Sequence, residues 1–218
     1  MRSFRSAIAV GCDLIECDVH LSSDARLVVI HDHTLERTTN GAGMVKDHTA
    51  AELRKLDAGD GEKIPLLQEV IELAIGKVGL VIELKQLPPM YPGLEEKLIN
   101  MLRQLGAVPE CAVISFNHAA IHDLRKMEPT LQLGILEGAR PLHPAQMLRE
   151  VGADVYSPHW GAIDPQVVKE VHGAGGAVGV WPVDDEAALA WCRYAKPDSI
   201  FSNRPREIGA ALREWVTA

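Results

Sequence analysis

Short apolar segments rich in β-branched residues recur along the chain and alternate with segments that have a helical pattern. Most of the short segments lack the strict apolar–polar alternation of a half-exposed strand, which is typical of strands covered on both faces. We therefore predict eight strands, at Leu14–Val19, Leu27–His31, Leu80–Leu84, Ala112–Phe116, Leu131–Leu136, Asp154–Ser157, Ala177–Val183 and Ser199–Ser202. Seven of them are expected to be parallel, and Leu27–His31 is expected to be an extra strand close behind the first.

Helix-end signals lie between these strands. Residues 2–10 predict a helix that ends at Gly11. The segment from Thr49 to Glu52 has the capping-box pattern and predicts a helix that continues to Leu56. Four prolines stand where a first helical residue is expected, a position that tolerates the missing N–H: Pro65, Pro144, Pro165 and Pro205. Four leucines share one helix face: Leu94, Leu98, Leu102 and Leu105.

The order of these elements predicts an α/β fold. From position 80 onward a strand and a helix repeat about every 20–25 residues, which indicates a parallel sheet, either open and doubly wound or closed as a (β/α)8 barrel. No Gly-x-Gly-x-x-Gly segment follows a predicted strand, which disfavours a dinucleotide-binding fold and favours the barrel. A complete barrel begins with a strand, whereas this chain begins with a predicted helix. The first strand is therefore expected to be missing, and the two unpaired sheet edges favour a homo-oligomer.

Composition limits the classes of protein. The 218 residues fit a single domain, residues 1–218, and 47% hydrophobic with 24% charged residues is an ordinary globular composition. The net charge is −8 and no Lys/Arg-rich run occurs, so nucleic-acid binding is not expected. No apolar run approaches the ~18 residues of a membrane span, and no signal-peptide pattern is present. Four cysteines without metal or disulfide spacing indicate free thiols and a cytoplasmic location, unless a signal preceded this start.

Two acids stand close together on the first predicted strand. Side chains alternate between the two faces of a strand, so Glu16, Asp18 and His20 share one face. The flanking residues are apolar, and buried carboxylates are unfavourable unless they are paired. Oxygen ligands of this kind bind hard cations such as Mg²⁺ or Ca²⁺. The alternative is a pair of surface acids on an exposed strand.

A second acidic strand end follows. Glu83 and Lys85 share a face at the end of the next parallel strand, and such ends meet at the active-site end of a barrel. Glu83 is therefore expected to join Glu16 and Asp18, with Lys85 neutralising the acids or holding a phosphate oxygen. A structural Glu–Lys ion pair is the alternative. His31 ends another apolar segment and is a candidate proton donor or acceptor, or else a hydrogen-bonded surface histidine.

Taken in order, these segments resemble the glycerophosphodiester phosphodiesterase family. The matching segments are residues 9–21, 28–32, 34–41, 64–70, 82–85, 115–116, 180–183 and 200–205. The resemblance implies a TIM-type barrel with a small insertion after the second strand, here about residues 32–63. It also implies hydrolysis of glycerophosphodiesters to an alcohol and glycerol 3-phosphate, a reaction of lipid and glycerol metabolism.

The same resemblance implies roles for single residues. Glu16, Asp18 and Glu83 correspond to ligands of a divalent metal, Mg²⁺ or Ca²⁺, and His31 corresponds to one of two catalytic histidines. Lys85 would bind substrate beside the phosphate, and Trp181 would line the substrate pocket. The family's first strand, with its His-Arg-Gly and Glu-Asn-Thr motifs, has no counterpart in this sequence, so the second histidine, an arginine and a glutamate ligand are missing. Three other histidines, His20, His33 and His159, are not expected to replace that histidine.

Three functions stay open at this point. The first is a metal-dependent glycerophosphodiester phosphodiesterase, with the activity of this shortened chain in question. The second is a non-catalytic barrel of the same ancestry that binds a phospho-ligand or a partner protein. The third is another metal-dependent barrel enzyme, a lyase or aldolase, which the segment around His31 and Asp32 argues against. The missing histidine favours the second function for this polypeptide, whereas the retained acids and His31 favour the phosphodiesterase.

Overall fold

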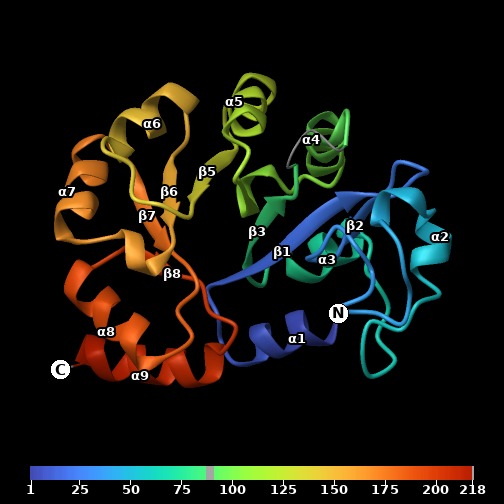
Figure 1. Ribbon diagram of the computed structural model, residues 1–218, viewed down its shortest axis with the longest axis horizontal. Helices are drawn as coiled ribbons and strands as arrows, with labels where there is room; N and C mark the ends of the chain where they lie inside the picture. Colours follow the sequence, from blue (N-terminus) through green and yellow to red (C-terminus); the bar gives the residue numbers. More distant parts are fainter. Residues whose placement is uncertain (87–90, 218) are drawn as a thin grey trace. The chain divides into compact units, whose positions relative to one another are not determined.

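The computed structural model describes residues 1–86 and 91–217, and it divides into two compact units, Met1–Leu131 and Gln132–Ala218 (Figure 1). The first unit contains α1 (Arg2–Ala9), β1 (Leu14–Leu21), β2 (Leu27–Val29), η1 (Val45–Asp47), α2 (Ala50–Leu53), α3 (Leu67–Ala74), β3 (Gly79–Leu84), α4 (Leu94–Gln104), η2 (Val108–Glu110), β4 (Cys111–Ser115) and α5 (His118–Met127). The second contains β5 (Gln132–Glu137), α6 (Pro144–Val151), β6 (Val155–Pro158), η3 (Trp160–Ala162), α7 (Pro165–Gly173), β7 (Ala177–Val180), α8 (Glu186–Ala195), β8 (Ser199–Ile200) and α9 (Pro205–Thr217). Here η marks a 3₁₀ helix.

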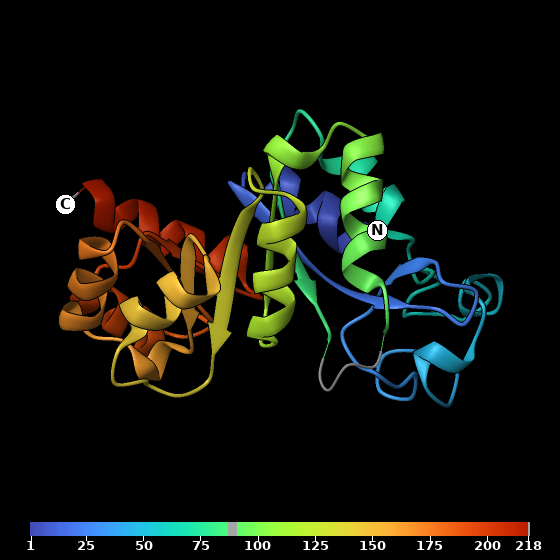
Figure 2. The ribbon, with the colours of Figure 1, turned by 90° about the horizontal axis from the view of Figure 1, so that it is seen from above.

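The strands of the first unit lie in the order β2-β1-β3-β4. β2 is antiparallel to β1, whereas β1, β3 and β4 are parallel to one another. In the β1–β3 register Asp18 lies opposite Glu83, so the acids of the two strands are neighbours. Helix α3 contacts β2 and β3, while α4 and α5 pack together beside β4, as the view from above shows (Figure 2).

The second unit repeats the strand–helix alternation with parallel strands in the order β5-β6-β7-β8. All eight predicted strands are therefore present, and the predicted extra strand is the antiparallel β2. Three strands are shorter than predicted, one of which is β8, which ends at Ile200 instead of Ser202. β7 ends at Val180 instead of Val183 because Pro182 has no N–H to continue the ladder. β2 ends at Val29 instead of His31, where the chain leaves the edge of β1.

The helix signals are confirmed with two corrections. Thr49 forms the predicted capping box, in which its backbone N–H donates to Glu52 Oε2 at 2.8 Å, but α2 ends at Leu53 instead of Leu56. The prediction that Pro65 begins a helix is wrong, since α3 begins at Leu67. The carbonyl of Pro65 accepts the N–H of Val29 at 2.9 Å, which holds this residue against β2. The other three prolines each begin a helix: Pro144, Pro165 and Pro205.

Residues 32–63 lie between β2 and α3 and have a hydrophobic cluster of their own. Its buried members are Val28, Ile30, Leu35, Val45, Ala50, Leu53 and Ile64. These side chains come partly from β2, so the segment is anchored to the strand that leads to His31. The description of this segment as a family insertion stays a prediction, as do the missing first strand and the single domain.

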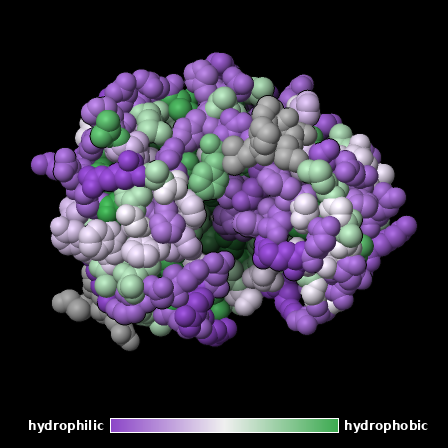
Figure 3. Space-filling view, viewed as in Figure 1, coloured by the Kyte–Doolittle hydropathy of each residue, from purple (hydrophilic) through white to green (hydrophobic). Residues whose placement is uncertain are grey.

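Hydrophilic residues cover most of the face seen in Figure 3. Within residues 1–86 and 91–217 no helix is long and apolar enough to cross a membrane. The structure confirms the predicted α/β class with parallel strands in each unit, and closure of the strands into a barrel stays a prediction.

Candidate functional site

Three carboxylates converge where β1 and β3 run side by side. Glu16 and Asp18 are two residues apart on β1, and Glu83 lies opposite Asp18 on β3. One ligand oxygen from each of them lies within 4.8 Å of the others. The structure therefore brings together the three acids that the sequence analysis predicted as metal ligands.

Lys85 neutralises part of this cluster. Its Nζ lies 2.9 Å from Asp18 Oδ1 and 2.5 Å from Glu83 Oε1, and only 13% of its side chain is exposed. The backbone N–H of Lys85 donates to the carbonyl of Val19 at 3.2 Å, which extends the pairing of the two strands beyond the end of β3. The ammonium thus holds Asp18 and Glu83 together as the central charge of the cluster.

Glu16 is the acid of the cluster that forms no ion pair with Lys85 in the described part of the chain, whereas Asp18 and Glu83 both do. Its Oε1 is buried and has no hydrogen-bond partner among the described residues. Burial raises the pKa of Glu16 well above its usual 4.5, and the charges of Asp18 and Glu83 raise it further, against the opposing effect of Lys85. Carboxylate oxygens are ligands that hard divalent cations bind in proteins, and Glu16 Oε1 has no partner among the described residues that such an ion would have to displace. The residues therefore fit such an ion.

Burial also shifts the two neighbouring groups. It raises the pKa of Glu83, and the nearby Lys85 only partly opposes this effect. For Lys85 itself burial lowers the pKa, but the charges of Glu83 and Asp18 outweigh burial and raise it. The ammonium therefore stays protonated at neutral pH and is a permanent positive charge beside the acids.

His31 follows the end of β2 and is exposed over 61% of its side chain. Its Nδ1 lies 2.6 Å from Asp32 Oδ1, and a carboxylate only accepts, so Nδ1 carries the proton. This tautomer leaves Nε2 free to exchange a proton. Arg37 donates through Nε and a terminal nitrogen to the two oxygens of Asp32, at 2.5 and 2.8 Å. Hydrogen bonds from Arg37 and His31 hold the pKa of Asp32 well below its usual range.

The pair of Asp32 and Arg37 orients His31 and was not assigned a role from the sequence. The available signal was weak, since a single Asp–Arg spacing after a strand occurs on many surfaces.

A pocket of about 170 Å³ adjoins His31. It is lined by Val29, Ile30, His31, Thr38, Ala58, Ile64 and Pro65. The hydroxyl of Thr38 is buried without a hydrogen-bond partner in the described part of the chain. The pocket is large enough for a small polar group beside His31.

His20 is on β1 but does not face solvent. It is fully buried, its Nδ1 lies 2.7 Å from the hydroxyl of Tyr91, and its Nε2 lies 3.2 Å from the carbonyl oxygen of His31. Burial lowers the pKa of His20 to about 4 and raises that of Tyr91 to about 12. Both ring nitrogens are therefore engaged within the protein.

Trp181 belongs to the second unit, next to the end of β7. Its indole N–H donates to the carbonyl of Ser157 at 2.8 Å, and its ring meets His159 edge-to-face with centroids 5.5 Å apart. Trp160 donates its backbone N–H to the carbonyl of Trp181 at 2.8 Å. These contacts fix the indole within its own unit, and its role in lining a substrate pocket stays a prediction.

Comparisons with known proteins agree on one family. The sequence model described as "Glycerophosphoryl diester phosphodiesterase family" matches residues 1–207. A glycerophosphodiester phosphodiesterase of Caldanaerobacter subterraneus is 38% identical over 220 residues, 97% of this chain and 90% of that protein. One from Bacillus altitudinis is 33% identical over 94% of this chain and 88% of that protein.

Solved structures give the same result. A phosphodiesterase of Oleispira antarctica, solved in complex with the product sn-glycerol-3-phosphate, has a TM-score of 0.86 and 30% identity, over 97% of this chain and 90% of that one. A structure from Silicibacter pomeroyi, at 21% identity, shows the likeness of the fold, with a TM-score of 0.91 over 99% of this chain and 88% of that one.

Proposed function

Because the chain belongs to the glycerophosphoryl diester phosphodiesterase family, we propose that it hydrolyses glycerophosphodiesters to an alcohol and glycerol 3-phosphate with a divalent metal ion. The observation that carries the proposal is the convergence of Glu16, Asp18 and Glu83 within 4.8 Å. The Oleispira relative, solved with sn-glycerol-3-phosphate, supports the choice of product.

Glu16, Asp18 and Glu83 would hold Mg²⁺ or Ca²⁺ through carboxylate oxygens. When bound, the ion offsets the negative charge on the phosphate oxygens, which grows in the transition state. Glu16 is the ligand that gains most from the ion because its buried Oε1 has no donor within the described residues.

Lys85 and His31 supply the remaining chemistry of this unit. A compact ammonium held at the edge of the acids binds a phosphate oxygen as a point charge. His31, with Nδ1–H fixed on Asp32, exchanges a proton at Nε2. It protonates the departing alkoxide or takes the proton of the attacking water, so that the P–O bond to the alcohol breaks as a new one to water oxygen forms.

We keep two earlier expectations as parts of this proposal and add a third, the size of the leaving alcohol. Residues 1–218 form a single phosphodiesterase-like barrel domain with an insertion at about residues 32–63. Trp181 lines the substrate pocket. The leaving alcohol is small, in keeping with the pocket of about 170 Å³ beside His31.

The test is release of glycerol 3-phosphate from glycerophosphocholine, measured with Mg²⁺, with Ca²⁺ and after chelation. The double variant Glu16→Gln/Asp18→Asn should lose metal binding in calorimetry together with turnover. Glu72→Gln/Asp123→Asn removes the same charge from the exposed surfaces of α3 and α5 and should change neither. Turnover that survives complete chelation, or unchanged metal binding in the first variant, would contradict the proposed site.

A second arm uses the chain with a family-type first strand, ending in His-Arg-Gly, joined ahead of Met1. Activity in this extended form and weak activity in the chain as given would assign the second catalytic histidine that the family resemblance implies to that strand. If both forms are folded, bind metal and are inert, the phosphodiesterase proposal is wrong.

A further inference from the structure

The segment that carries His31 leaves the sheet directly after β2. β2 pairs with β1 as far as Val29, opposite Val19, and Ile30 adds one more bond by donating its N–H to the carbonyl of Asp18 at 3.1 Å. The backbone carbonyl of His31, one residue further along, accepts from the ring of His20, at 3.2 Å. The buried side chain of His20 therefore holds the backbone of His31 directly after the last backbone hydrogen bond between β2 and β1.

The partners of His20 fix its tautomer. A backbone carbonyl can only accept, so Nε2 of His20 carries the hydrogen that reaches His31. In a neutral ring Nδ1 is then the acceptor, and the hydroxyl of Tyr91 donates to it at 2.7 Å. The ring of His20 also meets His33 edge-to-face, with centroids 5.1 Å apart. One imidazole thus contacts two residues of the segment that follows β2.

Tyr91 is itself held to the end of β3. The side chain of Gln86 donates to the carbonyl of Tyr91 at 2.9 Å and accepts its N–H at 3.0 Å. Asn117 donates to the carbonyl of Gln86 at 2.7 Å, so this point is tied to the start of α5. Gln86 directly follows Lys85, which contacts Asp18 and Glu83. Besides the direct bond from Ile30 to Asp18, a chain of contacts through Gln86, Tyr91 and His20 therefore connects the acid cluster to His31.

We propose that His20 is a positioning residue for the proposed reaction: its imidazole links the His31 backbone to the Tyr91 hydroxyl and so sets where His31 stands relative to the acid cluster. This inference rests on the proposed function only for the role of His31. His20 itself touches no substrate, because it is fully buried and both ring nitrogens are bonded within the protein. Small displacements of a reacting group lower turnover strongly, so loss of the hydrogen bonds of His20 should lower kcat.

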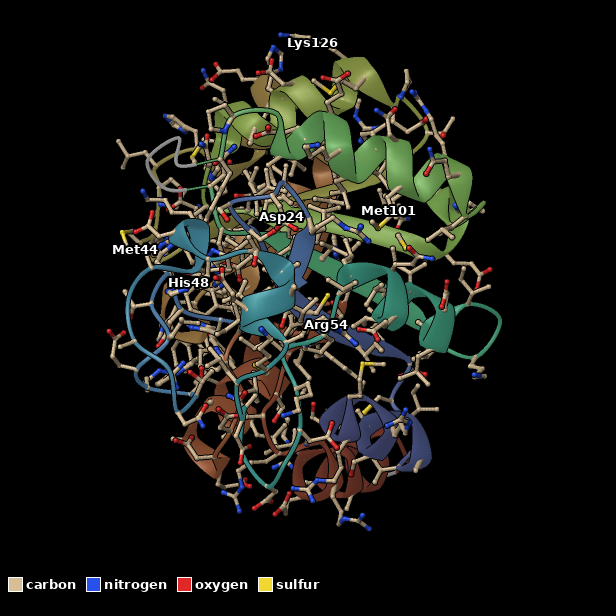
Figure 4. All side chains as sticks on the ribbon, turned by 90° about the vertical axis from the view of Figure 1, so that its right-hand side faces the viewer. Asp24, Met44, His48, Arg54, Met101 and Lys126 are labelled. Carbon is tan, nitrogen blue, oxygen red and sulfur yellow. The ribbon has the colours of Figure 1, made fainter. Side chains whose placement is uncertain are left out.

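Three variants test this link. His20→Leu removes both hydrogen bonds, His20→Gln retains an amide donor for the His31 carbonyl, and Tyr91→Phe removes one hydroxyl and leaves the ring in place. His48→Leu is the matched control, because His48 also bonds a backbone carbonyl through Nε2, that of Ala42 at 3.1 Å (Figure 4). Turnover of glycerophosphocholine, metal binding by calorimetry and amide hydrogen exchange of residues 30–33 are measured for each.

In His20→Leu kcat should fall by about tenfold or more with KM within about twofold, since binding groups are unchanged. His20→Gln should retain kcat within about threefold, Tyr91→Phe should lose about two- to fivefold, and His48→Leu should match the wild type. Hydrogen exchange of residues 30–33 should accelerate in His20→Leu and not in His20→Gln. Metal affinity should stay unchanged in all four variants.

A folded His20→Leu variant with unchanged kcat, or a Gln variant as slow as the Leu variant, would overturn the proposal. If the Leu variant does not fold, Tyr91→Phe decides, and an unchanged kcat there also counts against the link. If the wild type has no phosphodiesterase activity, the proposed function fails by itself. The hydrogen-exchange comparison then still decides whether His20 orders the His31 segment.

Discussion

Replacing Lys85 with methionine removes the charge at the centre of the acid cluster and keeps an unbranched side chain that is one atom shorter. Nζ lies 2.9 Å from Asp18 Oδ1 and 2.5 Å from Glu83 Oε1, with all three side chains at most 16% exposed. At an effective dielectric constant of about 20, each contact corresponds to about 6 kcal/mol of attraction. Desolvation of the ammonium offsets much of this, and breaking a buried ion pair typically lowers the free energy of unfolding by about 3–5 kcal/mol.

The assay is urea unfolding in the absence of divalent metal. For a slope of about 2 kcal/mol per M, the midpoint of Lys85→Met should fall by about 2 M. Lys126→Met is the control, because Lys126 also contacts a carboxylate, Asp123 at 3.0 Å, but on the exposed surface visible at the edge of the molecule (Figure 4). Exposed pairs contribute little, so its midpoint should stay near that of the wild type.

Added Mg²⁺ or Ca²⁺ makes the experiment specific for the acid cluster. Without Lys85 the three carboxylates have no competing cation, so the variant should bind the ion more tightly, and saturating metal should restore most of its lost stability. A metal-free variant as stable as the wild type would show that Lys85 does not compensate the acids. A destabilised variant that metal rescues no better than the wild type would show that these carboxylates do not form a cation site.

Two further predictions concern Glu16 and His31. Since burial raises the pKa of Glu16 above its usual 4.5, the metal-free protein holds a proton there that the unfolded chain has lost. The stability from this group is complete below pH 4.5 and is lost as pH rises through the raised pKa, so urea midpoints should fall over that window without metal; a flat profile would show that Glu16 is not desolvated. Replacing His31 with glutamine should lower kcat by about 10²–10⁴-fold with metal affinity unchanged in calorimetry, whereas a fully active variant would exclude His31 as the proton carrier.

Local patterns predicted the elements well because each strand and helix follows from neighbouring residues. The eight strands, the capping box at Thr49 and three of four helix-starting prolines are examples. Pro65 fails because a tertiary hydrogen bond overrides the local signal, with Val29 donating to its carbonyl from a strand 36 residues earlier in the sequence (65 − 29). Element boundaries depend on such partners, which no local pattern contains.

The acid cluster was predictable because strand geometry alone brings its residues together. Strand alternation places Glu16 and Asp18 on one face, and the parallel register places Glu83 beside them. The groups that orient His31 were not predictable. His20 and Tyr91 are 71 residues apart in the sequence, and the position of Tyr91 depends on its two hydrogen bonds with the side chain of Gln86. A pattern can indicate which residue types carry chemistry, but the contacts that fix their positions arise only from packing.

In the first unit some buried polar side chains have all their hydrogen bonds and others do not. The groups that position His31 belong to the first kind, and Glu16, a proposed metal ligand, belongs to the second. His20, Tyr91 and Gln86 are buried with their side-chain hydrogen bonds made, which gives a rigid frame. Within the described residues, one buried oxygen of Glu16 has no hydrogen-bond donor. An unsatisfied carboxylate next to a fully bonded frame is unfavourable for folding alone. It becomes favourable when a cation binds, so the stability lost at Glu16 in the metal-free protein is the free energy that metal binding recovers.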